Sequence, residues 1–143
     1  MFLNFVKVYG HLTISVTNSF NQLIDSREYS NLIVSIGKRW ITGRLKDTGN
    51  SHVIPREMFH MAIGTDRHAG WPDSISSSEL ISLKCSHELA RVVLTSSEIF
   101  DNKIVYTAVF NKGIGVGSIV EAGIFNDSLE GIMLCRTEFD AIN

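Results

Sequence analysis

Glu121 is the acidic side chain with the clearest chemical interest in this 143-residue chain, because it interrupts the apolar run Ile-Val-Glu-Ala-Gly-Ile-Phe. A carboxylate that is buried in such a run needs a cationic partner. Arg91 and Arg136 both lie in segments that are typical of strands, so either could supply that partner. General acid–base catalysis needs a second, matched group, which the local sequence does not provide. We therefore expect a structural ion pair that fixes the register of neighbouring strands.

Three histidines and two acidic residues of the chain are of the types that bind metal ions. His60, His68 and His87, together with Asp66 and Glu88, could converge on one ion. Their spacing, however, is neither that of a single helix face nor that of a zinc knuckle. We expect no metal and no other cofactor.

The glycine-rich segment at residues 112–117 has the sequence Lys-Gly-Ile-Gly-Val-Gly. A loop that cradles phosphate must lead into a helix, whereas this one leads into the strand-like Ser-Ile-Val-Glu. A glycine-rich bend is the better interpretation. No serine stands in a G-x-S-x-G elbow, so the sequence specifies no catalytic site and we expect no enzyme.

Composition narrows the classes of partner. Thirteen basic and fifteen acidic residues give a formal net charge of -2, so no basic field favours nucleic acid or an anionic membrane. No apolar stretch reaches the length of about 18 residues that a membrane-spanning helix needs, and residues 1–8 are typical of a strand rather than a signal peptide. We expect Cys85 and Cys135 to be reduced thiols in apolar surroundings; a pairing formed later, outside the cell, is the alternative.

The first third of the chain predicts a hairpin and a helix. Residues 11–16 alternate with a period of two, and polar residues at 18–21 form the turn before a second strand. Asn31 is typical of a helix N-cap, and apolar residues recur at helical spacing as far as Lys46. Gly37 and Gly43 would let this helix pack closely, and its basic residues would form a solvated face.

The remainder predicts strands around one long loop. Strands are expected near residues 58–63, 88–94, 103–110, 119–125 and 132–137, with a helical turn at 78–83. The strand at 103–110 is apolar on both faces, so we expect both faces to be at least partly covered, by a second sheet, a helix or a neighbouring subunit. The predicted fold is mainly β (α+β), an antiparallel β-sandwich or twisted sheet with one packed α-helix. One domain would span 1–143, with the hairpin and helix at about 1–46 and a C-terminal β-meander at about 58–140.

Four segments carry a family resemblance: His-Met-Ala-Ile-Gly-Thr at 60–65, Glu-Leu-Ala-Arg at 88–91, Val-Tyr-Thr-Ala-Val-Phe at 105–110 and Ile-Val-Glu-Ala-Gly-Ile-Phe-Asn at 119–126. In this order they resemble a group of small virion structural proteins of tailed bacteriophages. The N-terminal domains of phage tail and collar fibres look distantly similar. The resemblance covers residues 58–139 strongly and the first third weakly.

Two departures from that group suggest where partners bind. Its usual Gly-Thr-Gly is replaced here, since Thr65 is followed by Asp66, Arg67 and His68, in a long loop that also contains Trp71. These four residues, Asp66, Arg67, His68 and Trp71, are our candidate interface; core packing is the alternative for Trp71, as it is for Trp40. The group also usually runs on into a further strand, so we expect an open C-terminal edge that a neighbouring subunit completes.

The resemblance implies a non-enzymatic bacteriophage virion structural protein of the tail, baseplate or collar, which anchors fibres or joins rings. A capsid decoration (cement) protein is the alternative, and a small wall-degrading hydrolase a remote one. The expected partners are other phage virion proteins and further copies of the chain, with no nucleic acid and no membrane.

Overall fold

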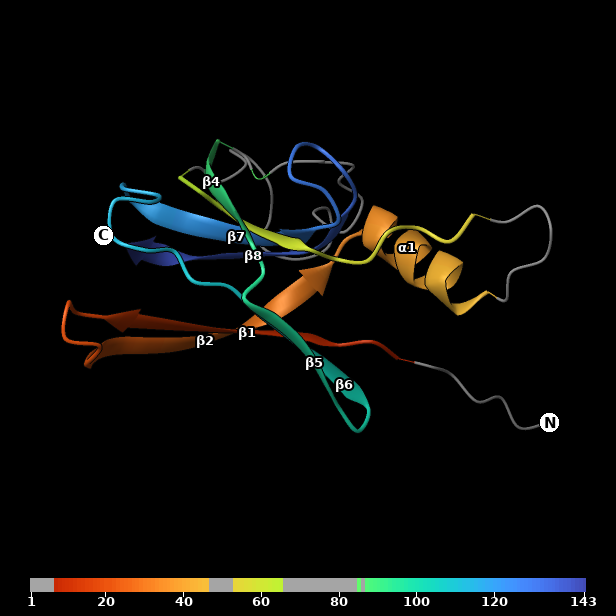
Figure 1. The fold of residues 1–143 in the computed structure, drawn as a ribbon, viewed down its shortest axis with the longest axis horizontal. Helices are drawn as coiled ribbons and strands as arrows, with labels where there is room; N and C mark the ends of the chain where they lie inside the picture. The colour runs from red at the N-terminus through yellow and green to blue at the C-terminus, as the bar shows by residue number, and fades with distance from the viewer. Residues whose placement is uncertain (1–6, 47–52, 66–84, 86) are drawn as a thin grey trace.

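The structure is a computed structural model that describes residues 7–46, 53–65, 85 and 87–143. Within these residues the chain forms eight strands and one helix (Figure 1). In chain order they are β1 (Gly10–Thr17), β2 (Leu23–Ile33), α1 (Ser35–Leu45), β3 (His60–Gly64), β4 (Glu88–Val93), β5 (Ser96–Phe100), β6 (Lys103–Thr107), β7 (Ile119–Phe125) and β8 (Met133–Ile142). The predicted fold class is confirmed: the protein is mainly β and antiparallel, with one helix.

Six strands form a curled sheet in the order β1-β2-β8-β7-β3-β4, and β5 and β6 form a second, two-stranded sheet. The β1–β2 hairpin is closed by Asn18, whose side-chain Oδ1 accepts hydrogen bonds from the backbone N–H groups of Phe20 and Gln22. Asn21 adopts the left-handed conformation, with a φ of 58°. Such side-chain bonds to nearby amides are the reason that asparagine favours turns.

The sheet curls where β2 meets β8. These two strands pair only through Leu32 and Ile33, at the end of β2. The earlier part of β2 diverges from β8, and the β1–β2 hairpin lies beneath β7 and β8 in the view of Figure 1. Tyr29 of β2 then packs on Phe139 of β8, with 5.5 Å between the ring centroids. Apolar side chains of the hairpin, of the central strands and of the segment after β6 close this side of the core: Leu12, Ile14, Tyr29, Ile63, Ala90, Phe110, Ile119, Ala122, Phe139 and Ile142.

The predicted helix start is wrong. β2 continues through Asn31 to Ile33, and α1 begins at Ser35 after Val34, which makes no side-chain cap hydrogen bond. Asn31 instead lies in the strand, where its amide nitrogen donates to Cys135 Sγ and its oxygen accepts from Thr137 Oγ1. Pairing with β8 therefore outweighs the local capping preference of asparagine.

Gly37 and Trp40 dock the helix on β8. A Cβ atom at Gly37 would overlap the carbonyl oxygen of Leu134, so only glycine permits this close approach. Trp40 is buried in a cluster with Ile33 and Leu134, so it packs in the core rather than at an interface.

Two further predictions about the second half need correction. The strands from β3 to β8 do not form a simple meander, because β7 pairs with β3 rather than with β6. The C-terminal strand is not an edge, since β8 lies between β2 and β7 and the edges are β1 and β4. Where β2 diverges from β8, the Arg27 guanidinium donates to the carbonyl oxygens of Asp140 and Ala141. The helical turn predicted at 78–83 lies outside the described residues.

Candidate functional site

The predicted site residues fall into two groups. Asp66, Arg67, His68 and Trp71, the candidate interface, lie outside the described residues. The predicted ion-pair residues are described: the structure brings Glu121 and Arg136 together and places Arg91 in a separate cluster.

Glu121 and Arg136 form an ion pair between β7 and β8, through Oε1 and Nε. Their side chains are 0% and 2% exposed. The register sets Glu121 directly opposite Glu138, and Arg136 Nη2 also lies 2.7 Å from Glu138 Oε1. One guanidinium thus serves two carboxylates that would otherwise repel each other across the strands. Because a register slip would leave these charges buried without partners, the contact favours one strand alignment.

Gly64 and Cys85 complete the surroundings of this ion pair. Gly64 of β3 pairs with Glu121, and a Cβ there would lie 2.7 Å from Glu121 Oε2. Burial raises the pKa of the Cys85 thiol well above its ordinary value, and the charge of Glu121 raises it further. The site therefore holds a protonated thiol beside an ion-paired carboxylate, which is not the thiolate that a nucleophilic cysteine requires.

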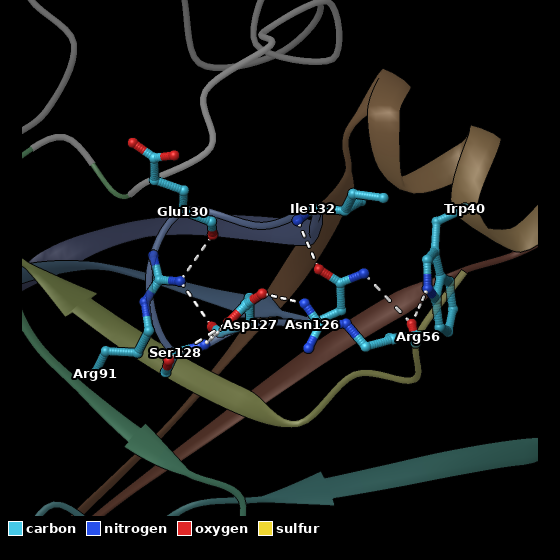
Figure 2. Close-up of polar contacts among 8 residues, drawn as sticks. All are labelled: Trp40, Arg56, Arg91, Asn126, Asp127, Ser128, Glu130 and Ile132. Carbon is cyan, nitrogen blue, oxygen red and sulfur yellow. Dashed lines mark hydrogen bonds and ion pairs between the residues drawn. The ribbon is translucent and has the colours of Figure 1, made fainter.

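Arg91 organises a second cluster, around the turn between β7 and β8 (Figure 2). Its Nη1 donates to the carbonyl oxygens of Asp127, at 2.9 Å, and Glu130, at 2.8 Å. Its remaining nitrogens bind the Glu88 carboxylate at 2.7 and 2.9 Å. The guanidinium also stacks on Phe125, 3.8 Å from the ring centroid. A single buried cation thereby fixes both the turn and the start of β4.

Asn126 and Arg56 tie the other side of the turn to the helix. Asn126 Oδ1 accepts from the backbone of Ile132 at 2.7 Å, while its amide nitrogen donates to the Arg56 carbonyl. Trp40 Nε1 donates to the same carbonyl at 2.7 Å. The Arg56 guanidinium pairs with Asp127 (Figure 2). We call these five residues, Trp40, Arg56, Arg91, Asn126 and Asp127, the turn clasp.

The chemistry of the turn clasp is structural. The Ser128 backbone N–H, followed by Arg56, holds the pKa of Asp127 below its ordinary value. Asp127 is therefore ionised at neutral pH and already accepts bonds on both carboxylate oxygens. The strands predicted at 119–125 and 132–137 leave a turn between them, but no local signal marked Arg56 or Arg91 as the partners of that turn. The clasp presents Leu129, which is 69% exposed, on a fixed backbone.

The β5–β6 hairpin, which we call the arm, is covered only in part by the described residues. β6 ends at Thr107, and Tyr106 packs against the core. Further out, four large apolar side chains are exposed: Ile99 (77%), Phe100 (50%), Ile104 (53%) and Val105 (41%). Figure 1 shows the arm projecting from the curled sheet. A strand that is apolar on both faces is therefore not covered on both faces by the described part of this chain.

The described histidines stand apart from any metal-like cluster. His60 is buried with its ring edge-on to Phe59, and burial lowers its pKa. Among the residues that the structure describes, no three His, Cys, Asp or Glu side chains are placed to hold a metal ion; His68 and Asp66 lie outside that part. The glycine-rich segment forms a bend that leads into β7, with left-handed φ values at Gly113 and Gly115.

In the described ranges, no helix combines the length and apolar character needed to cross a membrane. Comparisons with protein-family models, with curated proteins and with solved structures found nothing that matches this chain.

Proposed function

We propose that this protein is a non-enzymatic structural protein of a bacteriophage virion, which acts in the tail, baseplate or collar as an adaptor that anchors a fibre or joins rings. The observation that carries the proposal is the arm, because it exposes four large apolar side chains. An isolated two-stranded hairpin is only marginally stable in water, so packing against another surface would stabilise it. Contiguous exposed apolar surface of this kind marks protein interaction sites.

The division between core and surface supports the same proposal. The buried charges of Glu121 and Arg136 pair with each other inside the sheet, whereas large apolar side chains of the arm are exposed to solvent. The tip of the β1–β2 hairpin adds three more exposed apolar side chains, those of Phe20, Leu23 and Ile24. A well-packed body with apolar extensions suits a subunit that gains stability by assembling.

The family resemblance points the same way. The residues that carry it lie in β3, β4, β7 and β6 with the segment after it, that is, in three neighbouring strands of the large sheet and in one strand of the arm. These residues include Glu121 of the central ion pair and Val105 of the arm. The proposed mechanism is repeated burial of apolar arms on neighbouring virion proteins.

The test measures what the purified protein binds. Light scattering gives its mass alone and mixed with fibre, baseplate and capsid proteins of the same phage. Capture of fibre or baseplate protein supports the adaptor, and binding to capsids alone would replace it with the decoration protein. Binding to none of them would overturn the proposal.

A matched pair of variants locates the contact. Ile99→Ser combined with Ile104→Ser should abolish capture, since both side chains are exposed on the arm. Leu129→Ser, which removes a comparably exposed side chain from the turn, is the control and should bind normally if the arm carries the contact. Equal capture by both variants would contradict the role given to the arm.

A further inference from the structure

The arm is apolar on both of its faces. In the β5–β6 register Ile99 stands opposite Ile104 on one face, while Phe100 and Val105 lie on the other. A sheet that lies flat on a partner needs only one apolar face. An arm with two is better suited to insertion between two walls, which cover both faces at once.

The same chain contains an open groove. It is lined by the segment before and at the start of β1, by the end of β2 and by one residue of α1: Val8, Tyr9, Gly10, His11, Ser30, Asn31, Leu32, Ile33 and Lys38. Its volume is about 440 Å³, within the range of about 300–1,000 Å³ found for binding pockets. Val8 and Tyr9 are 52% and 82% exposed, so the groove also has apolar surface that a partner could bury.

The groove also has backbone available for a strand. β1 pairs with β2 only from Gly10, which stands opposite Asn31, and residues 7–9 belong to no described strand. An unpaired segment next to a sheet edge is a template for an added strand.

Charges on the arm and the groove are complementary. Glu98 lies in the exposed part of β5 and Asp101 in the turn of the arm, against one cation, Lys103. Lys38 lines the groove, and exposed Lys7 and Arg39 lie close to it in the sequence. Residues 35–46, which include α1, contain four basic residues and no acid. An acidic apolar arm and a basic apolar groove attract each other. Every copy of the chain has one arm and one groove, so two copies can bind each other.

We propose that the arm of one copy inserts into the β1–β2–α1 groove of a second copy, with Glu98 facing Lys38 across the contact. The proposal rests on the proposed structural role, because it names the self-association through which a virion subunit would assemble. Each copy provides one arm and one groove, so a reciprocal contact closes a pair, whereas a one-way contact builds a ring or an open filament.

Charge reversal at the two positions provides the test. Glu98→Lys and Lys38→Glu should each weaken self-association of the full chain about tenfold or more, because like charges then meet at the contact. Mixing the two variants should restore assembly, since each arm then meets a groove of opposite charge. The double variant, which carries both changes in one chain, should also assemble. Light scattering and sedimentation over a range of concentrations measure all four samples.

Glu130→Lys is the matched control, because it reverses an equally exposed acid on the turn, away from the arm. It should leave self-association unchanged. Circular dichroism should show the wild-type spectrum for every variant, as all three side chains are exposed. Failure of the mixture to assemble, or equal weakening by Glu130→Lys, would overturn the arm-in-groove contact.

The outcomes separate this inference from the function above. A wild-type monomer that still captures fibre or baseplate protein would reject the arm-in-groove contact and keep the adaptor. Charge-dependent self-association without any capture of virion proteins would keep the contact and reject the adaptor.

Discussion

The centre of the sheet and the arm differ in what they bury: the centre buries charged groups, and the arm exposes apolar ones. In the centre, Glu121 and Arg136 are charged groups in a buried place, and each is engaged by an opposite charge within the chain. In the arm, Ile99 and Ile104 are apolar groups in an exposed place, without cover from the described residues. The centre fixes strand register, whereas the apolar side chains of the arm would contribute favourable free energy only when another surface buries them. The comparison teaches that stability and association can reside in separate strands of one small protein.

Removing the central cation should have the largest effect. Arg136→Met leaves two carboxylates, Glu121 and Glu138, facing each other, and loss of one partner of a buried pair costs about 3–5 kcal/mol. Urea titration would measure the free energy of unfolding. Arg27→Met is the matched control, since its bonds to the Asp140 and Ala141 carbonyls are exposed and its ion pair with Asp25 is partly exposed; exposed ion pairs contribute about 0–1 kcal/mol. Equal losses of unfolding free energy in the two variants would contradict the prediction that the buried ion pair matters more than the exposed one.

A smaller loss is expected where the helix meets the centre. Gly37→Ala places a methyl group against the Leu134 backbone, and overpacking of this kind costs about 1–3 kcal/mol. Thr42→Ala, at an exposed position of the same helix, should change the free energy of unfolding by no more than about 0.5 kcal/mol. A Gly37→Ala protein as stable as the wild type would mean that the helix can move away from β8 without loss.

His60 should make stability depend on pH. Burial, and then the charge of Arg91, lowers the His60 pKa from its ordinary value of 6.5, so below that pH the unfolded chain takes up a proton that the folded chain does not. The contribution is fully present above pH 6.5 and declines as the pH falls below it. Thermal midpoints at about pH 7.5 and about pH 5.5, compared between the wild type and His60→Gln, isolate it. His11→Gln, at an exposed site, is the control; an equal pH response in wild type and His60→Gln would contradict the prediction.

The arm should contribute least to folding. Phe100→Ser removes a half-exposed ring, and surface changes of this kind stay within about 0.5 kcal/mol. Urea titration of the isolated monomer checks this, and fluorescence of a dye that binds apolar surface should decrease. A loss of stability comparable to that of Gly37→Ala would show that the arm belongs to the folding core after all.

Patterns of alternation and turn residues predicted the fold class and most strands, because side-chain period and turn chemistry are local properties. The same patterns misplaced the start of α1, since the contacts of Asn31 with β8 lie more than a hundred residues away. They also suggested covered faces for residues 103–110, because alternation shows that a strand is apolar but not which molecule covers it.

The candidate site was partly predictable. An acid in an apolar run requires a partner, and the sequence offered two arginines for Glu121; strand order decides between them, and the structure pairs Glu121 with Arg136. The role of Arg91 depends on carbonyl groups of a turn 36 to 39 residues away, which no local pattern encodes.

The place of β8 has a consequence for how the chain folds. β8 is the last described strand in the sequence but lies in the middle of the sheet, where it joins β2 to β7. The β1–β2 hairpin and the β3–β4–β7 strands therefore remain separate until β8 has been synthesised and inserted. Such long-range pairing slows folding, to about milliseconds or seconds in domains dominated by it. A chain stalled during synthesis before β8 would expose both halves of the apolar core, so the step most open to aggregation precedes the last strand.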